Sequence, residues 1–144
     1  METYVIDASV GLKWYFDEAG KESADFLADQ LREKKIQLVV PEFFYAECAN
    51  VLRTKVRRRM IKSADAIKML DELLQLPLKR YSDWELSDSA LEDALQWDLT
   101  VYDAMYVALA EIYVAPFVTA DEQILKALRN RFDFILPLNE IGSF

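Results

Sequence analysis

The chain has 144 residues, and its net charge of −8 comes from 25 acidic and 17 basic residues. This length predicts a single domain, residues 1–144, and the 53% content of hydrophobic residues is sufficient for a buried core. The absence of histidine excludes Ser-His-Asp and Cys-His nucleophile systems and histidine-ligated zinc, while the single cysteine, Cys48, excludes an internal disulfide.

Short apolar runs alternate with longer segments of helical periodicity. We expect strands at 4–6, 36–40, 78–81, 117–119 and 134–136. We expect helical segments at 10–16, from Gly20 to about residue 35, from 41 into the basic run, from 63 through 74, up to Trp97, at 101–114 and after Asp121. This alternation predicts an α/β fold, a three-layer α/β/α sandwich with a mainly parallel central sheet.

Three of the expected helix starts depend on single residues. Pro41 suits the first position of a helix, where no backbone donor is needed. Ser63 is a candidate N-cap for the helix that follows the basic run. For the helix that reaches Trp97, Ser87 is a candidate cap and a start near Asp83 is the alternative.

Two carboxylates follow predicted strands. Asp7 comes directly after the first strand, and Asp121 lies two residues beyond the strand at 117–119. Parallel strands bring their carboxyl ends, where open α/β sheets bind ligands, to one edge. The simpler interpretation, that each carboxylate only caps a helix, stays open for both.

Two further acidic residues lie in apolar stretches. Glu47 shares one helical face with Phe43, Ala46 and Asn50, and this face is expected to point inward. Asp103 is the single charged residue between positions 101 and 110, in the first turn of an apolar helix where the dipole favours an anion. Burying an unpaired charge is costly, so both acids need partners, although a hydrogen-bonded structural role is the alternative for Asp103.

Converging carboxylates repel one another, and a divalent cation relieves that repulsion. With oxygen ligands and no histidine, the metals favoured are Mg²⁺ and Mn²⁺. Such ions bind phosphate esters and activate water. The sequence therefore predicts that Asp7, Glu47, Asp103 and Asp121 form a metal-dependent catalytic site.

Basic residues gather in one segment of this acidic chain. Arg53, Arg57 and Arg58 lie within ten residues that also include Lys55, Arg59 and Lys62. The three arginines are candidates for contact with RNA or with an acidic partner. The alternative is a solvated helix end, since cations near a helix C-terminus are favoured by the dipole.

Four segments together resemble the motifs of PIN-domain proteins. They are residues 4–9 (YVIDAS), 41–52 (PEFFYAECANVL), 100–110 (TVYDAMYVALA) and 118–121 (VTAD). The resemblance spans nearly the whole chain in order, and within the family it is closest to VapC-type toxins of prokaryotic toxin–antitoxin pairs. None of the four acidic positions is substituted.

The resemblance implies an Mg²⁺- or Mn²⁺-dependent endoribonuclease with a PIN-like fold. It assigns the metal site to the four acidic residues and supporting roles to Ser9, Thr119 and Asn50. It also implies an RNA substrate, a cognate antitoxin that covers the site, and a homodimer or higher homo-oligomer. Because the N-terminus lacks a signal peptide and no apolar run is long enough for a membrane span, we expect a cytoplasmic protein without membrane association.

Three other functions fit these residues less well. A non-catalytic PIN-like module that binds RNA or protein would be expected to lack one of the acidic positions. A phosphotransfer receiver domain would need paired acids near the first strand and a lysine after the last, but Asp7 stands alone and residues 134–138 contain no lysine. A phosphatase with an Asp-x-Asp nucleophile is disfavoured because Ser9 occupies the second position.

Overall fold

Five parallel strands form the central layer of the computed structural model, which describes residues 1–142. They are β1 (Glu2–Ile6), β2 (Ile36–Pro41), β3 (Lys79–Tyr81), β4 (Phe117–Thr119) and β5 (Ile135–Pro137). Their order across the sheet is β3-β2-β1-β4-β5, so β1 is the middle strand. The pairings between them are parallel, which confirms the predicted sheet and brings the carboxyl ends of the strands to one edge.

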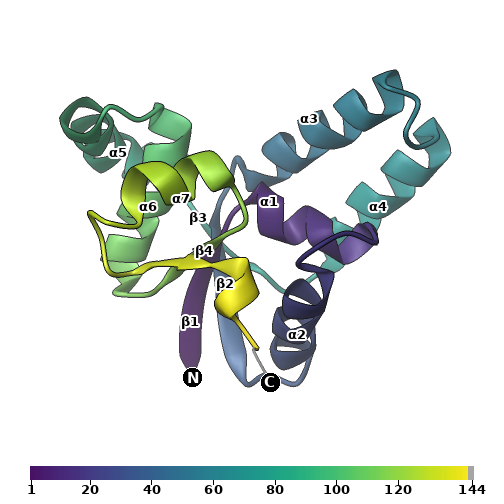
Figure 1. The fold of residues 1–144 in the computed structure, drawn as a ribbon, viewed down its shortest axis with the longest axis horizontal. Coiled ribbons are helices and arrows are strands. Elements are labelled where there is room, and N and C mark those ends of the chain that lie inside the picture. The colour runs from purple at the N-terminus through teal and green to yellow at the C-terminus, as the bar shows by residue number, and fades with distance from the viewer. Residues whose placement is uncertain (143–144) are drawn as a thin grey trace.

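Helices cover both faces of this sheet, so the predicted three-layer sandwich is confirmed (Figure 1). The α-helices are α1 (Ala8–Gly11), α2 (Lys21–Arg32), α3 (Phe44–Arg57), α4 (Ser63–Gln75), α5 (Asp83–Trp97), α6 (Val101–Tyr113) and α7 (Glu122–Leu128). Two 3₁₀ helices, η1 (Leu12–Tyr15) and η2 (Leu138–Glu140), complete the elements of the described chain. Helices α3 and α4 form a hairpin that extends away from the sheet, the α3–α4 arm (Figure 1).

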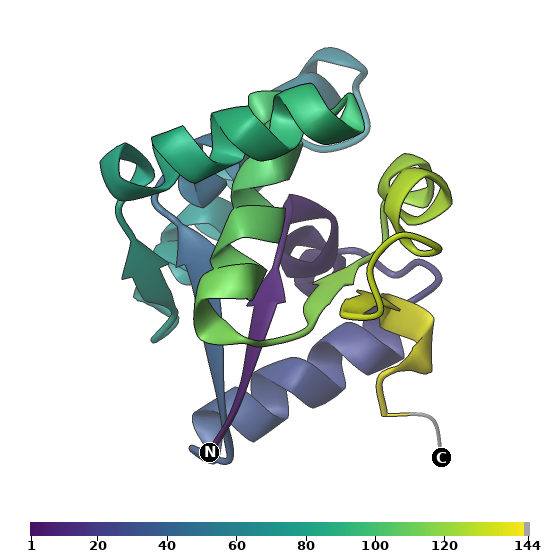
Figure 2. The same ribbon diagram turned by 90° about the vertical axis from the view of Figure 1, so that its left-hand side faces the viewer.

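Successive side chains of each strand point to opposite faces of the sheet, as in any pleated strand. Ile6 and Val40 contribute to the core under α1 to α4, whereas their neighbours Val5 and Val39 contribute to the core under α5 to α7. Figure 2 shows the molecule from the side on which α5 and α6 cover the sheet. Helix α6 is buried nearly all round, from Ala104 to Ala110, which explains its continuous apolar sequence.

The structure corrects the three helix starts that were predicted from single residues. Pro41 does not begin a helix but ends β2, because the sheet continues until the Glu42 N–H bonds to the Tyr81 carbonyl. Ser63 is the first residue of α4 rather than its N-cap, which is Lys62. Ser87 lies inside α5, where its hydroxyl donates to the Asp83 carbonyl, so the alternative start near Asp83 is the correct one.

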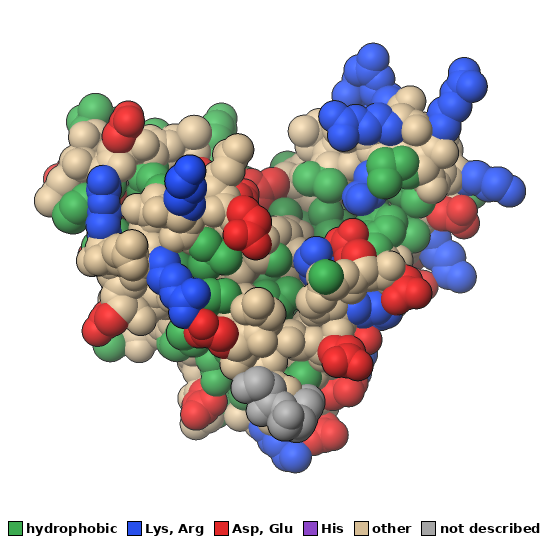
Figure 3. All heavy atoms as spheres, viewed as in Figure 1, with side chains coloured by type: hydrophobic (Ala, Val, Ile, Leu, Met, Phe, Trp, Pro, Cys, Tyr) green, Lys and Arg blue, Asp and Glu red, His purple; other side chains and the backbone are tan. Residues whose placement is uncertain are grey.

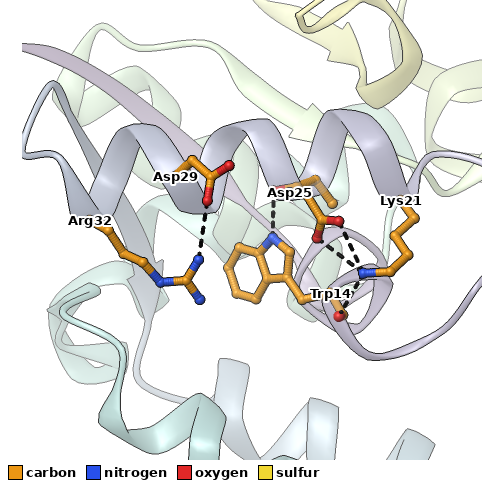
Figure 4. A network of polar contacts seen from close by, with 6 residues as sticks. Trp14, Lys21, Asp25, Asp29 and Arg32 are labelled. Atoms are coloured by element: carbon orange, nitrogen blue, oxygen red, sulfur yellow. Dashed lines mark hydrogen bonds and ion pairs between the residues drawn. The ribbon is translucent and has the colours of Figure 1, made fainter.

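The predicted helix at 10–16 is divided into α1 and the tighter η1, and polar contacts tie η1 to α2 (Figure 4). The Trp14 indole N–H donates to the Ala24 carbonyl at 2.6 Å. The Lys21 ammonium donates to the Trp14 carbonyl at 3.1 Å and pairs with Asp25. These contacts hold η1 beside the first turns of α2. None of the helices within residues 1–142 has the length and apolar character needed to cross a bilayer.

Gly11 provides a test of how closely α1 packs on α3. A Cβ atom at this position would lie 2.8 Å from the Phe44 ring, which is fully buried. We expect Gly11→Val to lower the free energy of unfolding by roughly 2 kcal/mol, because overpacking forces buried groups apart. Urea denaturation measures this decrease. The double variant with Phe44→Leu should recover part of it, and a Gly11→Val protein as stable as the parent would contradict the packing described.

Candidate active site

A cavity of about 330 Å³ opens at the edge where the strands end. Its lining includes the four predicted acidic residues, Asp7, Glu47, Asp103 and Asp121, together with Ser9 and Tyr106. The acids come from the end of β1, the first turn of α3, the first turn of α6 and the N-cap of α7. Figure 3 shows acidic side chains in the notch between the α3–α4 arm and the side of the molecule that carries α5 to α7. The tertiary structure thus brings together residues that are up to 114 positions apart, from 7 to 121.

Asp7 is the most deeply placed of these carboxylates, with 4% of its surface exposed. The Ser9 hydroxyl donates to Oδ1 at 2.5 Å, and the Thr119 hydroxyl donates to Oδ2 at 2.5 Å. The Val10 N–H also donates to Oδ1, so Asp7 caps α1 as well as lining the cavity. Burial raises the pKa of Asp7 to about 7, although these hydrogen bonds oppose the shift by favouring the charged form.

The same two hydroxyls fix the segment that carries Asp121. The Ala120 N–H donates to Ser9 Oγ at 2.9 Å, and the Asp121 N–H donates to Thr119 Oγ1 at 3.1 Å. Asp121 in turn accepts from the N–H groups of Gln123 and Ile124, so it caps α7, as predicted. Asp7 and Asp121, the two acids that follow strands, therefore each cap a helix and line the cavity. The capping role and the place in the candidate site do not exclude each other.

The surroundings of Glu47 differ from the prediction. The face that it shares with Ala46 and Asn50 is not turned into the core, since both of these residues are exposed. The buried face of α3 consists of Phe44, Cys48 and Leu52, one position further along the helix. Glu47 is instead half-buried at the cavity wall. Burial raises its pKa, the Tyr106 hydrogen bond opposes the shift, and the Asp103 and Asp121 charges add to it.

Tyr106 is a site residue that the sequence interpretation missed. Its hydroxyl donates to Glu47 Oε1 at 2.9 Å, and its exposed fraction is 1%. The ring stacks on Phe117 and meets Phe43 edge-on, each with ring centroids 5.4 Å apart. The available signal was its position three residues after Asp103, on the same face of the helix. Tyr106 orients the Glu47 carboxylate through Oε1, and the Ala8 N–H donates to the same carboxylate, which keeps further lone pairs for the cavity.

Asp103 lies at the half-buried N-terminus of α6. The Thr100 hydroxyl accepts the Asp103 N–H at 3.1 Å and caps the helix, so the Asp103 carboxylate is not the cap. Burial raises the pKa of Asp103, and the charge of Asp121 raises it further. A side-chain hydrogen bond with Thr100 opposes these shifts, so Asp103 has a structural hydrogen bond as well as a place at the cavity.

The donor set of this cavity fits a hard divalent cation. Within residues 1–142 its lining contains no lysine or arginine, so protein cations do not neutralise the four acids. No three of the acids in the described part of the chain lie close enough together to hold a metal ion directly. Mg²⁺ characteristically keeps several water ligands and uses one or two carboxylates, so a cavity with room for water between the acids suits it.

Two sets of predicted residues lie outside the cavity. Asn50 is exposed and does not line it, so its expected supporting role stays a prediction. Arg53 and Arg57 line a separate groove between α3 and α4, and Arg58 follows the end of α3. Figure 3 shows Lys and Arg side chains at the far end of the α3–α4 arm. Contact of these arginines with RNA or a partner also stays a prediction.

Comparison with known proteins finds relatives along most of the chain. The sequence model of the PIN domain family matches residues 4–129, a range that includes all four acidic residues of the cavity. Ribonuclease VapC3 of Pyrobaculum aerophilum is 35% identical over 122 residues, which cover 83% of this chain and 90% of that protein. Similarity at this level and coverage establishes the family.

Solved structures share the fold. The crystal structure of PAE2754 from Pyrobaculum aerophilum has a TM-score of 0.73 at 23% identity and covers 96% of this chain and 85% of its own. The structure of VapBC2 from Rickettsia felis bound to a DNA fragment of its promoter has a TM-score of 0.63 at 13% identity. The match covers 94% of this chain and 96% of the other. At these identities the likeness establishes the fold alone.

The raised pKa of Asp7 makes the stability of the metal-free protein depend on pH. Between the ordinary aspartate value and about 7, the folded chain retains a proton that the unfolded chain has released, so stability falls as pH rises through this window. Asp7→Asn should reduce that slope, to which Glu47 and Asp103 also contribute, and raise the thermal midpoint at pH 8 by on the order of 5 °C. Thermal unfolding in EDTA measures both effects, with the exposed Asp98→Asn as control. A steeper slope or a lower midpoint in Asp7→Asn would contradict this.

The Tyr106 hydrogen bond predicts a second measurable effect. Tyr106→Phe keeps the stacked ring but removes the donor to Glu47, and we expect about tenfold weaker Mn²⁺ binding because the carboxylate is no longer held in a fixed orientation. Titration calorimetry with Mn²⁺ measures the affinity. Tyr113→Phe, whose ring packs on Tyr81, is the matched control and should bind Mn²⁺ like the parent. Equal Mn²⁺ affinity in both variants would show that Glu47 needs no such positioning.

Proposed function

The chain belongs to the PIN-domain family, among its VapC-type ribonucleases, and we propose that it is an Mg²⁺- or Mn²⁺-dependent endoribonuclease that hydrolyses RNA phosphodiester bonds. The observation that carries the proposal is the single cavity lined by Asp7, Glu47, Asp103 and Asp121. Their separate origins on four elements make a shared structural role an insufficient explanation, because helix capping accounts for only two of them.

The residues of the cavity fit distinct tasks in this reaction. Asp7 is held by two hydroxyls, yet each carboxylate oxygen has more than one acceptor position, so Asp7 can also bind a cation. Asp103 and Asp121 complete the acidic wall. A bound Mg²⁺ or Mn²⁺ would lower the pKa of a water ligand and neutralise charge on the leaving oxygen.

Glu47 is the acid we assign to the attacking water. Its pKa is raised, and hydrogen bonds from Tyr106 and the Ala8 N–H hold its carboxylate, whose remaining lone pairs can accept a proton from water. The water oxygen bonds to phosphorus, the bond from phosphorus to the 3′ oxygen breaks, and that oxygen gains a proton. The products of this proposal are a 5′-phosphate and a 3′-hydroxyl.

We further propose that the enzyme is the toxin of a toxin–antitoxin pair, inhibited by a cognate antitoxin protein, and that it forms a homodimer or higher homo-oligomer. Similarity to ribonuclease VapC3 over 90% of that protein supports the proposed toxin role. Large exposed apolar side chains on α5, including Trp84 at 86% and Leu95 at 77%, support a further protein contact. Light scattering of the purified chain measures its oligomeric state.

Cleavage of 5′-labelled RNA by the purified chain tests the catalytic proposal. We expect cleavage with Mg²⁺ or Mn²⁺, none in EDTA, and products ending in 3′-hydroxyl. Asp103→Asn and Asp121→Asn should each lower the rate at least 100-fold, because each removes a charge from the cavity. Asp98→Asn, on an exposed residue at the end of α5, is the matched control and should cleave like the parent.

Three outcomes would overturn the proposal. Products ending in a cyclic phosphate would mean that the 2′-hydroxyl attacks and that no water is activated. Binding of RNA without any cleavage under these conditions would favour the non-catalytic module. A rate of Asp103→Asn equal to that of the parent would remove the assigned site.

A further inference from the structure

A second, larger cavity adjoins the candidate active site. Its volume is about 630 Å³, and its wall includes Thr119 and Ala120 from the end of β4. Thr119 donates to Asp7, and Ala120 directly precedes Asp121. Leu12 and Asp121 line the first cavity, and their chain neighbours Lys13 and Glu122 line the second. The two cavities therefore adjoin, and a polymer held in the first is within reach of the second.

The second cavity differs from the first in charge. Three cationic side chains line it, from Lys13, Lys126 and Arg129, against one acid, Glu122. In a chain with a net charge of −8, this local excess of positive charge beside an acidic site is unexpected. A cluster of cations at this position favours anionic groups that flank the reacting phosphate.

Lys13 is built into the wall rather than projecting from the surface. Only 19% of its side chain is exposed. Its stem passes Gly20, where a Cβ atom would lie 3.5 Å from Lys13 Cε and 3.2 Å from a Leu138 methyl. Gly20 also has φ +95°, a conformation that other residues adopt only at a cost. The fold therefore keeps a narrow space in which the Lys13 stem is enclosed.

The three cations are available to an anion. Lys126 is exposed, and its ammonium group has no ion-pair partner within residues 1–142. Lys13 pairs with Glu18 and Arg129 pairs with Glu140, both of them partly exposed acids outside the lining. The acid of each pair is nearly half exposed, and ion pairs open to water contribute little to stability, so exchanging the acid for a phosphate costs little.

The lining also indicates which part of RNA would bind. In the described chain no aromatic side chain lines this cavity, so it offers no surface for stacking a base. Point charges without stacking contact phosphates irrespective of sequence. We propose, resting on the ribonuclease function above, that the cavity formed by Lys13, Lys126 and Arg129 binds an RNA backbone phosphate adjacent to the one that is cleaved.

Binding of a fluorescein-labelled single-stranded RNA to the Asp103→Asn protein tests this proposal. Lys126→Met, and separately Lys13→Met, should weaken binding about threefold to tenfold, and each should reduce the slope of log Kd against log salt by about 0.7. The decrease in affinity should be similar for RNAs of different sequence. In the otherwise unaltered enzyme, the same changes should raise KM and leave kcat within about twofold.

Lys35→Met is the matched control. Lys35 also pairs with a neighbouring acid, Glu33, but precedes β2 at the opposite edge of the sheet, so it should change neither affinity nor salt slope. Thermal unfolding checks that each variant is folded. The exposed Lys126 keeps the proposal testable if the enclosed Lys13 cannot be replaced.

The results separate this proposal from the one on which it rests. If the unaltered chain does not cleave RNA, the ribonuclease function fails. If it cleaves RNA and Lys126→Met binds RNA with unchanged affinity and salt slope, the phosphate site is overturned. Binding of poly-glutamate that disappears in Lys126→Met while RNA binding is unchanged would assign the cavity to an acidic protein segment instead, and would equally overturn the RNA proposal.

Discussion

The burial of Asp7 at the end of the middle strand is the constraint on which the site depends. A carboxylate removed from water is stable only when hydrogen bonds or cations compensate for the missing hydration. Here the compensation comes from the hydroxyls of Ser9 and Thr119, which belong to α1 and β4. Through the backbone N–H groups that these hydroxyls accept, the loop carrying Asp121 is fixed as well. The buried Asp7 carboxylate thus connects the ends of β1 and β4 beside the cavity.

The order of the strands explains why the other two acids arrive at the same point. Because β1 lies between β2 and β4, the helices that follow β2 and precede β4 both begin or pack near its carboxyl end. Helix α3 carries Glu47 from one side and α6 carries Asp103 from the other, and Tyr106 connects them through its bond to Glu47. The aromatic contacts of Tyr106 with Phe43 and Phe117 make this connection rigid.

Charge is distributed so that an acidic chain can accept an acidic polymer. The acids converge inside the cavity, where a cation can neutralise them, and cations line the neighbouring cavity and the α3–α4 arm. Because salt screens exposed charges over roughly 10 Å, a phosphate responds mainly to the charges nearest to it rather than to the net charge of −8. The local positions of the charged side chains therefore matter more for phosphate binding than the net charge of the chain.

Hydrophobic periodicity and hydrogen bonds between near neighbours act within a few residues. The amino-acid sequence was therefore sufficient to predict the parallel α/β sandwich, the strand ends at Ile6 and Thr119, and the helix cap at Asp121. The absence of histidine restricted the chemistry equally directly. The buried face of α3 was not predictable in this way, because both of its faces carry apolar residues and the choice depends on what packs across from them. The position of Tyr106 three residues after Asp103 placed it on the same face of α6, but its bond to Glu47 joins residues distant in sequence, and only the tertiary structure identifies that partner.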